Sequence, residues 1–408
     1  MKKILRILHT SDWHIGKKLK EHERLQEFKK FFAWLEKIIV DEKIDALIVS
    51  GDIFDNRNPS IESQELYYSF LGKIAGKSCR HVVITSGNHD SAPFIDAPAG
   101  IMGRCDVHVI GRASGNEVIT LKDSDGRIGL IVCAVPFLHD DDIRTVKADD
   151  TPSEIQMAMK AGIMNHYAEV FEKAREVRGD SDVPIIAMGH LFLEAGKTQA
   201  EEGEHALYIG GAIKVGTDIF PEDIAYTALG HLHSPQSVGR ENIRYSGSPV
   251  AMTFGELDIP KSVSVVDFDG RNLSRLKEIQ VPVFQTMKRV SGDMAKIEAD
   301  IKELSELNES VWVEVTYTGS EAVGDIRERL EGILSLYPSV EVLSTRSESK
   351  TQTTSSGTET ESKPVTLENI KPLDMLSLYC SEKNIDKNTQ EIFEPLYKEI
   401  LIEMGLDF

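Results

Sequence analysis

The chain has 408 residues, 41% of them hydrophobic and 27% charged, which is the composition of a globular protein with room for roughly two or three domains. Its 66 acidic and 46 basic side chains give a formal net charge of −20. This charge disfavours a protein that holds nucleic acid through overall positive charge, although it says little about any one face. No apolar run is long enough to span a membrane, and charged residues interrupt the N-terminal apolar stretch, so we expect no signal peptide.

The cysteines indicate the compartment. They are scattered along the chain with neither disulfide nor metal-site spacing, at Cys79, Cys105, Cys133 and Cys380. Such thiols stay reduced in the cytosol, so the sequence predicts a cytoplasmic protein.

The first predicted element is a buried strand over the apolar residues 4–8, and a polar run follows it directly. Asp12 and His14 stand in this run two residues apart, so in extended chain their side chains leave on the same side and can share one metal ion. Alone, this pattern is weak, because a capping Asp beside a surface His is the more common arrangement.

The same arrangement recurs at four later strand ends. Each apolar run leads to Asp, Asn or His, and Gly directly precedes the first of these residues. These polar residues are Asp52, Asn88, His190 and the pair His231 and His233. Because ligands collect beyond the carboxyl ends of strands in α/β sheets, we expect all five ends to converge on one site.

The chemistry of this set points to metal ions. It contains carboxylates, an amide oxygen and imidazoles but no thiolate, which suits Mn, Fe, Zn or Co. Seven ligands are too many for one ion and suit two, with one carboxylate bridging. Two ions about 3.5–4 Å apart can clamp an in-line phosphoryl displacement. The alternative is that all five clusters are coincidental caps and core histidines.

The motif series resembles the calcineurin-like metallophosphoesterases over about the first 270 residues. The motifs are Asp12-x-His14, Gly51-Asp52, Gly87-Asn88-His89-Asp90, Gly189-His190 and Gly230-His231-x-His233. The amino-acid sequences of these motifs, in residues 9–17, 50–55 and 87–91, are similar to those of the SbcD family of bacterial nuclease subunits, which act with the SbcC ATPase on DNA ends. The resemblance implies an α/β fold: a two-sheet sandwich flanked by helices, with a small α/β cap domain and C-terminal docking helices.

The resemblance also implies a role for each site residue. Asp12, His14 and His233 would hold one divalent ion, and Asp52 would bridge to the second. Asn88, His190 and His231 would complete the second site, with Mn²⁺ the expected metal. His89 would face the scissile phosphate, and Asp90 would orient His89. For Asp90 the alternative is a helix N-cap, because a helix is expected to begin near Ser91.

Further along the chain, apolar periodicity predicts helices over residues 22–41, 61–75 and 153–178. Residues 194–211 form a polar, Gly-containing segment between two ligand motifs, which we interpret as a long loop over the site. The resemblance implies that the helices following the second and third motifs make a homodimer, within a heterotetramer with SbcC.

The predicted domains are a nuclease domain over residues 1–275, a cap domain over 280–345, a linker over 346–364 and a docking segment over 365–408. The cap is expected from two helices alternating with strands near 284–290, 311–317 and 339–344. The linker is Ser/Thr/Glu/Lys-rich with almost no apolar residues, which predicts flexibility. The last segment is again apolar-periodic, and by resemblance its helices dock on the SbcC coiled coil; the alternative is that they fold back on the cap.

The resemblance implies a dimetal-dependent DNA nuclease: an exonuclease on double-stranded ends and an endonuclease on hairpins or single strands, in DNA repair, recombination and replication. One alternative is a phosphodiesterase or phosphatase acting on small nucleotides or phosphoproteins. It would share the metal site but would have no evident use for the linker and terminal helices. Another is a metal-binding scaffold without turnover, which would not need His89.

Overall fold

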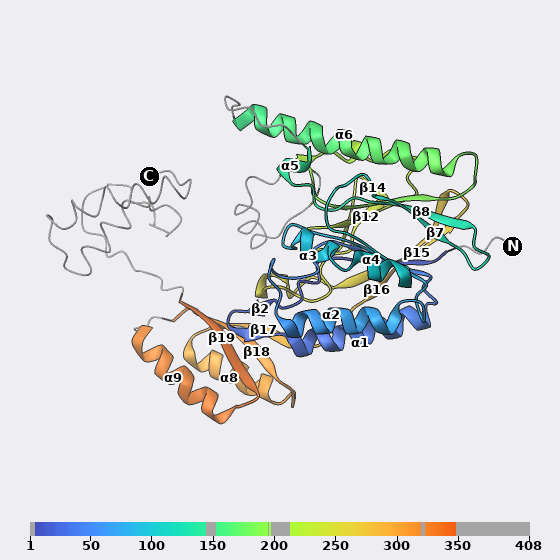
Figure 1. Ribbon diagram of the computed structural model, residues 1–408. Coiled ribbons are helices and arrows are strands. Elements are labelled where there is room, and N and C mark those ends of the chain that lie inside the picture. The colour runs from blue at the N-terminus through green and yellow to red at the C-terminus, as the bar shows by residue number, and fades with distance from the viewer. Residues whose placement is uncertain (1–4, 144–151, 195, 197–212, 320–322, 348–408) are drawn as a thin grey trace. The chain divides into compact units, whose positions relative to one another are not determined.

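The computed structural model describes residues 5–143, 152–194, 196, 213–319 and 323–347 (Figure 1). Most of the expected loop over 194–211, nearly all of the linker and the whole docking segment therefore lie outside the described residues. Among the residues that are described, no helix combines the length and the apolar character needed to cross a membrane.

Two six-stranded sheets form the first part of the fold. The first sheet has the order β16-β15-β1-β4-β5-β6, in which β1, β4, β5 and β6 run parallel and β15 runs antiparallel to both of its neighbours. Its strands are β1 (Ile7–Thr10), β4 (Ala46–Ser50), β5 (His81–Thr85), β6 (Val107–Ile110), β15 (Ser262–Asp269) and β16 (Asn272–Gln280).

The second sheet has the order β13-β14-β12-β9-β8-β7, with a parallel centre and an antiparallel strand at each edge. Its strands are β7 (Val118–Lys122), β8 (Ile128–Ala134), β9 (Ile185–His190), β12 (Tyr226–Gly230), β13 (Gln236–Val238) and β14 (Arg240–Tyr245). Every residue of β4, β5, β9 and β12 is buried, as expected for central parallel strands covered on both faces.

Helices cover the outer faces of the two sheets (Figure 1). The first sheet packs against α1 (Leu25–Asp41) and α2 (Ile61–Ile74), and the second against α6 (Pro152–Arg178). A separate apolar core between the sheets joins residues such as Ile48 and Val83 from the first to Met188 and Ala228 from the second. The predicted α/β sandwich flanked by helices is therefore confirmed.

The helix expected over residues 22–41 begins later than predicted, because residues 22 and 23 form a short strand. That strand, β3 (His22–Glu23), pairs with β2 (Lys18–Leu19). The remaining small elements of this part are α3 (Ala92–Asp96), α4 (Ala99–Met102), α5 (Asp140–Ile143), β10 (Phe192–Leu193), β11 (Lys214–Val215) and the 3₁₀ turns η1 (Gly103–Cys105), η2 (Thr217–Ile219) and η3 (Phe254–Glu256).

An aromatic cluster fixes the loop that follows β1. Trp13 is completely buried. Its ring packs edge to face against Phe32 of α1 and Phe70 of α2, with distances between ring centroids of 5.0 and 5.8 Å. Since Trp13 stands between Asp12 and His14, its burial anchors the backbone that carries both of these side chains.

A three-stranded parallel sheet with two helices forms the last described part. Its elements are β17 (Thr286–Gly292), α8 (Met294–Ser305), β18 (Val311–Tyr317), α9 (Val323–Leu336) and β19 (Val340–Ser347). They follow the predicted strand–helix alternation and have their own apolar core, which includes Ile297, Ile301 and Val313. A second small cluster, with Leu19, Phe254, Met287 and Trp312, joins this sheet to the sandwich.

Candidate metal centre

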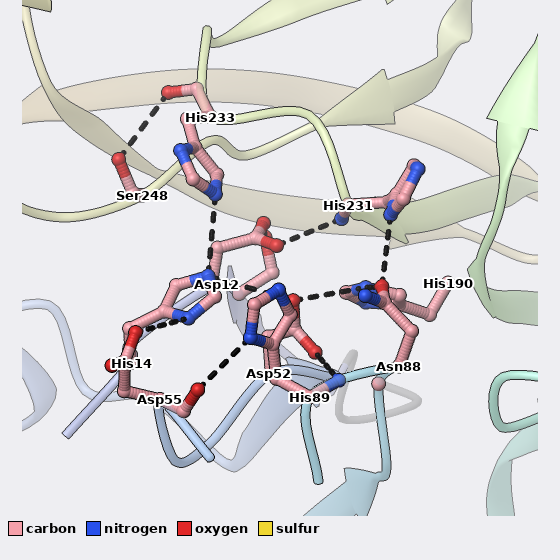
Figure 2. Close-up of polar contacts among 12 residues, drawn as sticks. Asp12, His14, Asp52, Asp55, Asn88, His89, His190, His231, His233 and Ser248 are labelled. Atoms are coloured by element: carbon pink, nitrogen blue, oxygen red, sulfur yellow. Dashed lines mark hydrogen bonds and ion pairs between the residues drawn. The ribbon is translucent and has the colours of Figure 1, made fainter. Parts of the chain in front are cut away.

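The five strand ends meet, as the sequence predicts, and they bring all seven expected ligands together (Figure 2). Loops after β1, β4 and β5 of the first sheet carry four of them, and β9 and the loop after β12 of the second sheet carry the rest. In chain order they are Asp12, His14, Asp52, Asn88, His190, His231 and His233. The site thus lies at the carboxyl ends of strands from both sheets, where the two sheets meet.

Asp52 lies at the centre of the cluster. Its Oδ2 atom is 3.4 Å from Nε2 of His14 and 3.3 Å from Nε2 of His190. The ligand atoms of Asp12, Asp52 and His190 all lie within 4.8 Å of one another. A carboxylate in this position can contribute to two adjacent ions.

The other donor atoms form one group on each side of Asp52. On one side, the Nε2 atoms of His14 and His233 are 3.2 Å apart. On the other, Oδ1 of Asn88 lies 3.0 Å from Nε2 of His190 and 3.0 Å from Nδ1 of His231. The donor atoms therefore form two neighbouring groups, one on each side of Asp52, and each group can surround one ion.

Close contacts require all four glycines that precede the expected ligands, and at two of them the closest contact is with another expected ligand. A Cβ atom on Gly87 would lie 2.1 Å from Oδ1 of Asp52, and a Cβ atom on Gly51 would lie 2.2 Å from Nδ1 of His190. Gly51 also has φ +82°, a conformation that other residues rarely adopt. The strand–Gly–ligand pattern in the sequence thus reflects the space that the ligand side chains themselves occupy.

Four of the ligands have strained backbones. The φ angles are 51° for Asp12, 47° for His14, 50° for Asp52 and 96° for His231. Non-glycine residues adopt positive φ rarely and at an energetic cost, and such residues concentrate at functional sites. Hydrogen bonds hold three of them in place. The amide of Asp12 donates to the carbonyl of Gly51, that of His14 to the carbonyl of Asp52, and that of His231 to Oδ1 of Asp12.

The electrostatics fit divalent cations. Burial raises the pKa of Asp12 to about 6. Burial alone would also raise the pKa of Asp52, but His190 and His14 outweigh it and hold that pKa well below its ordinary value. Burial lowers the pKa of His14 to about 4 and that of His231 to about 3, so both imidazoles offer neutral lone pairs.

His190 is the exception among the imidazoles. Burial works to lower its pKa, but the Asp52 carboxylate outweighs burial and raises the pKa to about 9. A protonated His190 therefore compensates part of the negative charge of the buried carboxylates of Asp52 and Asp12. A divalent cation with the preferences of Mn, Fe, Zn or Co fits these oxygen and nitrogen donors and could replace that proton.

His89 lies beside the ligands with its ring half-buried. Its Nδ1 atom is 2.9 Å from the carbonyl oxygen of Asp55, and its amide donates to Oδ1 of Asp52 over 3.0 Å. Because a carbonyl oxygen can only accept, Nδ1 carries the hydrogen and Nε2 is left for another partner. A ligand atom of His89 also lies within 4.8 Å of those of His14 and Asp52.

The expected role of Asp90 needs a correction. Its carboxylate does not hold the His89 ring; it accepts hydrogen bonds from the amides of Ile53, Phe54 and Gly87, at 3.1, 2.9 and 2.8 Å. Nor is it an N-cap, since α3 follows Ser91. Asp90 therefore fixes the loops after β4 and β5 against each other, and the contact to His89 belongs to Asp55.

Sequence reasoning also missed Glu256, which is 1% exposed and has Oε1 only 3.1 Å from Nδ1 of His233. The available signal was an acidic residue in the largely apolar segment 250–257, and it gave no indication of the partner.

A cavity of about 490 Å³ opens beside the centre. Ligands, including His14 and His231, line one part of it, and apolar side chains such as Phe137, Ile163 and Phe192 line another. A polar floor of candidate metal ligands beside an apolar wall can receive both parts of a nucleotide, the phosphate and the base.

Comparisons with known proteins agree with this geometry. A family described as "Calcineurin-like phosphoesterase" matches residues 5–235, a range that contains all seven expected ligands. The chain belongs to the calcineurin-like phosphoesterase family. A second family, described as "Type 5 capsule protein repressor C-terminal domain", matches residues 283–384.

Relatives within this phosphoesterase family narrow the assignment. The chain is 34% identical to the SbcD subunit of the SbcCD nuclease of Escherichia coli K12 over 346 residues, which is 84% of this chain and 85% of the relative. It is 37% identical to the Rhodobacter capsulatus protein of the same name over 291 residues, which is 68% of this chain and 70% of the relative. The Bacillus subtilis protein of that name is 33% identical over 268 residues, or 64% and 66%. The predictions of an SbcD-type phosphoesterase and of a metal-dependent enzyme of the nuclease class are confirmed.

Proposed function

We propose that this phosphoesterase cleaves DNA at a two-ion centre as the nuclease subunit of an SbcC–SbcD-type complex. It would act as an exonuclease on double-stranded ends and as an endonuclease on hairpins or single strands, in DNA repair, recombination and replication. The convergence of seven ligand-type side chains from both sheets carries the proposal. The relatives named SbcCD nucleases support the choice of DNA as substrate.

In this proposal each group of donor atoms holds one divalent cation, with Mn²⁺ as the expected metal. Asp12, His14 and His233 hold the first ion, Asn88, His190 and His231 hold the second, and Asp52 contributes to both. Bound there, two such ions would supply Lewis-acid stabilisation of a phosphodiester and a water of lowered pKa.

His89 supplies the proton chemistry at the phosphate. The Asp55 carbonyl fixes the ring through Nδ1, so Nε2 is the atom that can face a substrate oxygen. From that position it can protonate the leaving oxygen or stabilise charge on the phosphate. Asp90 acts indirectly, by keeping the loops that carry Asp52 and Asn88 in register.

The rest of the chain adapts this centre to a complex. We assign residues 1–275 to the nuclease domain, 280–345 to a cap that narrows access to DNA ends, and 346–364 to a flexible linker. Residues 365–408 dock on the coiled coil of the SbcC ATPase. The cytoplasm is the proposed compartment, supported by the free thiols of Cys79, Cys105 and Cys133.

A homodimer forms through the helices that follow the second and third motifs. Exposed apolar side chains on these helices support it, since Ile61 of α2 is 70% exposed and Ile101 of α4 is 78% exposed.

A manganese-dependent cleavage assay tests the substrate. It uses blunt and hairpin-ended DNA, with and without the SbcC partner and ATP, beside bis-p-nitrophenyl phosphate as a small diester. We expect DNA cleavage that the partner enhances. Turnover of the small diester without any cleavage of DNA in either state would contradict the nuclease proposal and favour small nucleotides or phosphoproteins as substrates.

A further inference from the structure

The 3₁₀ turn η3 touches the metal centre on one side. Glu256, its last residue, accepts from Nδ1 of His233, whose Nε2 atom points toward His14. Because a carboxylate only accepts, the hydrogen of the His233 ring sits on Nδ1, and the lone pair is presented at Nε2. A carboxylate behind a metal-binding imidazole fixes the orientation of the ring and increases its basicity.

Lys261 completes this support. Its ammonium group lies 2.5 Å from Oε2 of Glu256 and donates to the carbonyl oxygen of His233 over 3.0 Å. It is 8% exposed, so the pair is shielded from water. The amides of Met252 and Ser248 bond to Glu256 and to the His233 carbonyl at 3.0 and 3.1 Å, and Figure 2 shows Ser248 beside that carbonyl. His233 is thus held at both its ring and its backbone.

The other side of η3 touches the three-stranded sheet. Phe254, the first residue of the turn, is 3% exposed and packs in one cluster with Leu19, Met287 of β17 and Trp312 of β18. An ion pair between Arg289 of β17 and Asp258 adds a polar contact next to the turn. The three residues of η3 therefore connect Phe254, which contacts this sheet, to Glu256, which is the hydrogen-bond partner of His233.

We propose that Glu256 and Lys261 are positioning residues for His233, and that η3 couples the three-stranded sheet to the affinity of the first metal site. The inference rests on the proposed function in taking His233 as a metal ligand. A displacement of β17 and β18 would shift Phe254, and the same short turn would then shift the carboxylate that orients His233. A movement of the three-stranded sheet would in this way change the affinity of the first metal site for its ion.

Titration calorimetry with Mn²⁺ alone tests the positioning role. We expect Glu256→Gln to weaken one of two binding steps about 10–100-fold and to leave the other unchanged. Lys261→Met should weaken the same binding step. Lys261→Arg should keep most of the wild-type Mn²⁺ affinity, because it retains the positive charge beside Glu256. The matched control is Glu278→Gln, which removes a carboxylate paired with Arg244 outside the centre. Two wild-type binding steps in a folded Glu256→Gln protein would overturn the proposal.

Phe254→Ala tests the coupling. We expect it to weaken the same single step several-fold, although the side chain is not a ligand. The control is Ile301→Ala, which loosens the core of the three-stranded sheet without touching η3. Equal effects of the two variants, or none from Phe254→Ala, would overturn the coupling. These readouts need no substrate, so wild-type protein that fails to cut DNA while Glu256→Gln loses affinity would refute only the proposed function.

A second cluster lies at the amino-terminal ends of β5 and β6. It consists of His81, Asp106 and His108, whose ligand atoms lie within 4.8 Å of one another. His81 is 4% exposed, and its Nε2 is 2.8 Å from the carbonyl oxygen of Lys122. Nε2 must therefore carry the hydrogen, and Nδ1 has a lone pair that meets no hydrogen-bond partner within the described part of the chain.

The geometry points to a separate binding site for one divalent transition-metal ion of the Zn²⁺ class. A backbone carbonyl that fixes the tautomer of a buried imidazole is the usual support of a zinc ligand. Two imidazoles and one carboxylate leave a fourth position for water. Asp106 and His108 also repeat the spacing of Asp12 and His14.

Zinc content after dialysis against Zn²⁺ tests this site. We expect wild type to hold one more ion per chain than His108→Ala, while His22→Ala, which changes a histidine outside the cluster, matches wild type. His108→Asn serves if His108→Ala does not fold. Equal zinc content in wild type and a folded His108 variant would overturn the site.

Discussion

At the scale of single residues, the candidate centre could be predicted because its signal is local. Each ligand follows an apolar strand, and the glycine before Asn88 is needed because Asp52 occupies the space of a Cβ atom. Glu256 and Asp55 could not be predicted in the same way. Their contacts with His233 and His89 depend on loops that the fold brings together from distant parts of the chain.

Gly87→Ala tests this crowding. The added methyl group would meet Asp52 at 2.1 Å, so we expect Mn²⁺ affinity and diester turnover to fall at least tenfold. Overpacking of this kind typically costs about 1–3 kcal/mol of stability. Calorimetry measures the affinity, a diester assay the turnover, and thermal melting the stability.

Gly72→Ala is the matched control, since nothing lies within 4 Å of a Cβ atom at that position in α2. It should keep wild-type affinity and turnover. A Gly87→Ala protein that also binds Mn²⁺ as wild type does would show that Asp52 can move away, and would contradict the account of the crowded centre.

At the scale of elements, the long helices could be predicted from periodicity, whereas the short strands could not. The helix expected over 61–75 is α2 (Ile61–Ile74), but β2 and β3 have two residues each and therefore no periodicity to detect. The order of strands across each sheet also depends on contacts between distant segments, such as β1 with β15. Such pairing is visible only in the folded chain.

Glu117, just before β7, tests how α6 is attached to the second sheet. Burial opposes its ionisation, but His166 of α6 and nearby backbone amides outweigh burial and lower the pKa of Glu117 to about 2. This folded-state pKa is below the ordinary value of 4.5 for a glutamate side chain. The ionised side chain therefore stabilises the protein above pH 4.5, and this stabilisation is lost as the pH falls toward 2.

We expect Glu117→Gln to lower the melting temperature at pH 7 and to lower it much less at pH 2.5, where most of the stabilisation from the ionised side chain is already lost. Melting is measured in EDTA, so that loss of metal at low pH does not contribute. The control is Glu65→Gln at an exposed position of α2, which should behave as wild type at both pH values. An equal loss for Glu117→Gln at pH 7 and pH 2.5 would contradict the role of the charge.

At the scale of the whole molecule, the proposed dimer depends on exposed apolar side chains. We expect light scattering of wild type at micromolar concentration to give twice the chain mass of 45.4 kDa. Ile61→Asp with Ile101→Asp should return the single mass, because charged side chains oppose burial at an interface. Val40→Asp, at another exposed apolar position, is the control. A single mass for wild type would contradict the dimer.

The docking segment is tested by deletion of residues 365–408. We expect co-purification with the SbcC partner to be lost and both Mn²⁺ binding steps to be kept, because every proposed ligand lies before residue 234. A protein in which a Gly/Ser sequence of equal length replaces residues 348–364, after the end of β19, is the control and should still bind the partner. Survival of the complex after the deletion would contradict the docking proposal.

The most direct test of the two-ion phosphodiester site combines metal analysis and cleavage in His89→Leu. If His89 faces the phosphate and is not a ligand, this variant keeps two Mn²⁺ ions per chain and loses DNA cleavage by at least 100-fold, the scale of general acid–base catalysis. Asp52→Asn, which changes the central carboxylate, should instead lose bound metal. Loss of an ion from His89→Leu, or cleavage at the wild-type rate, would contradict the account.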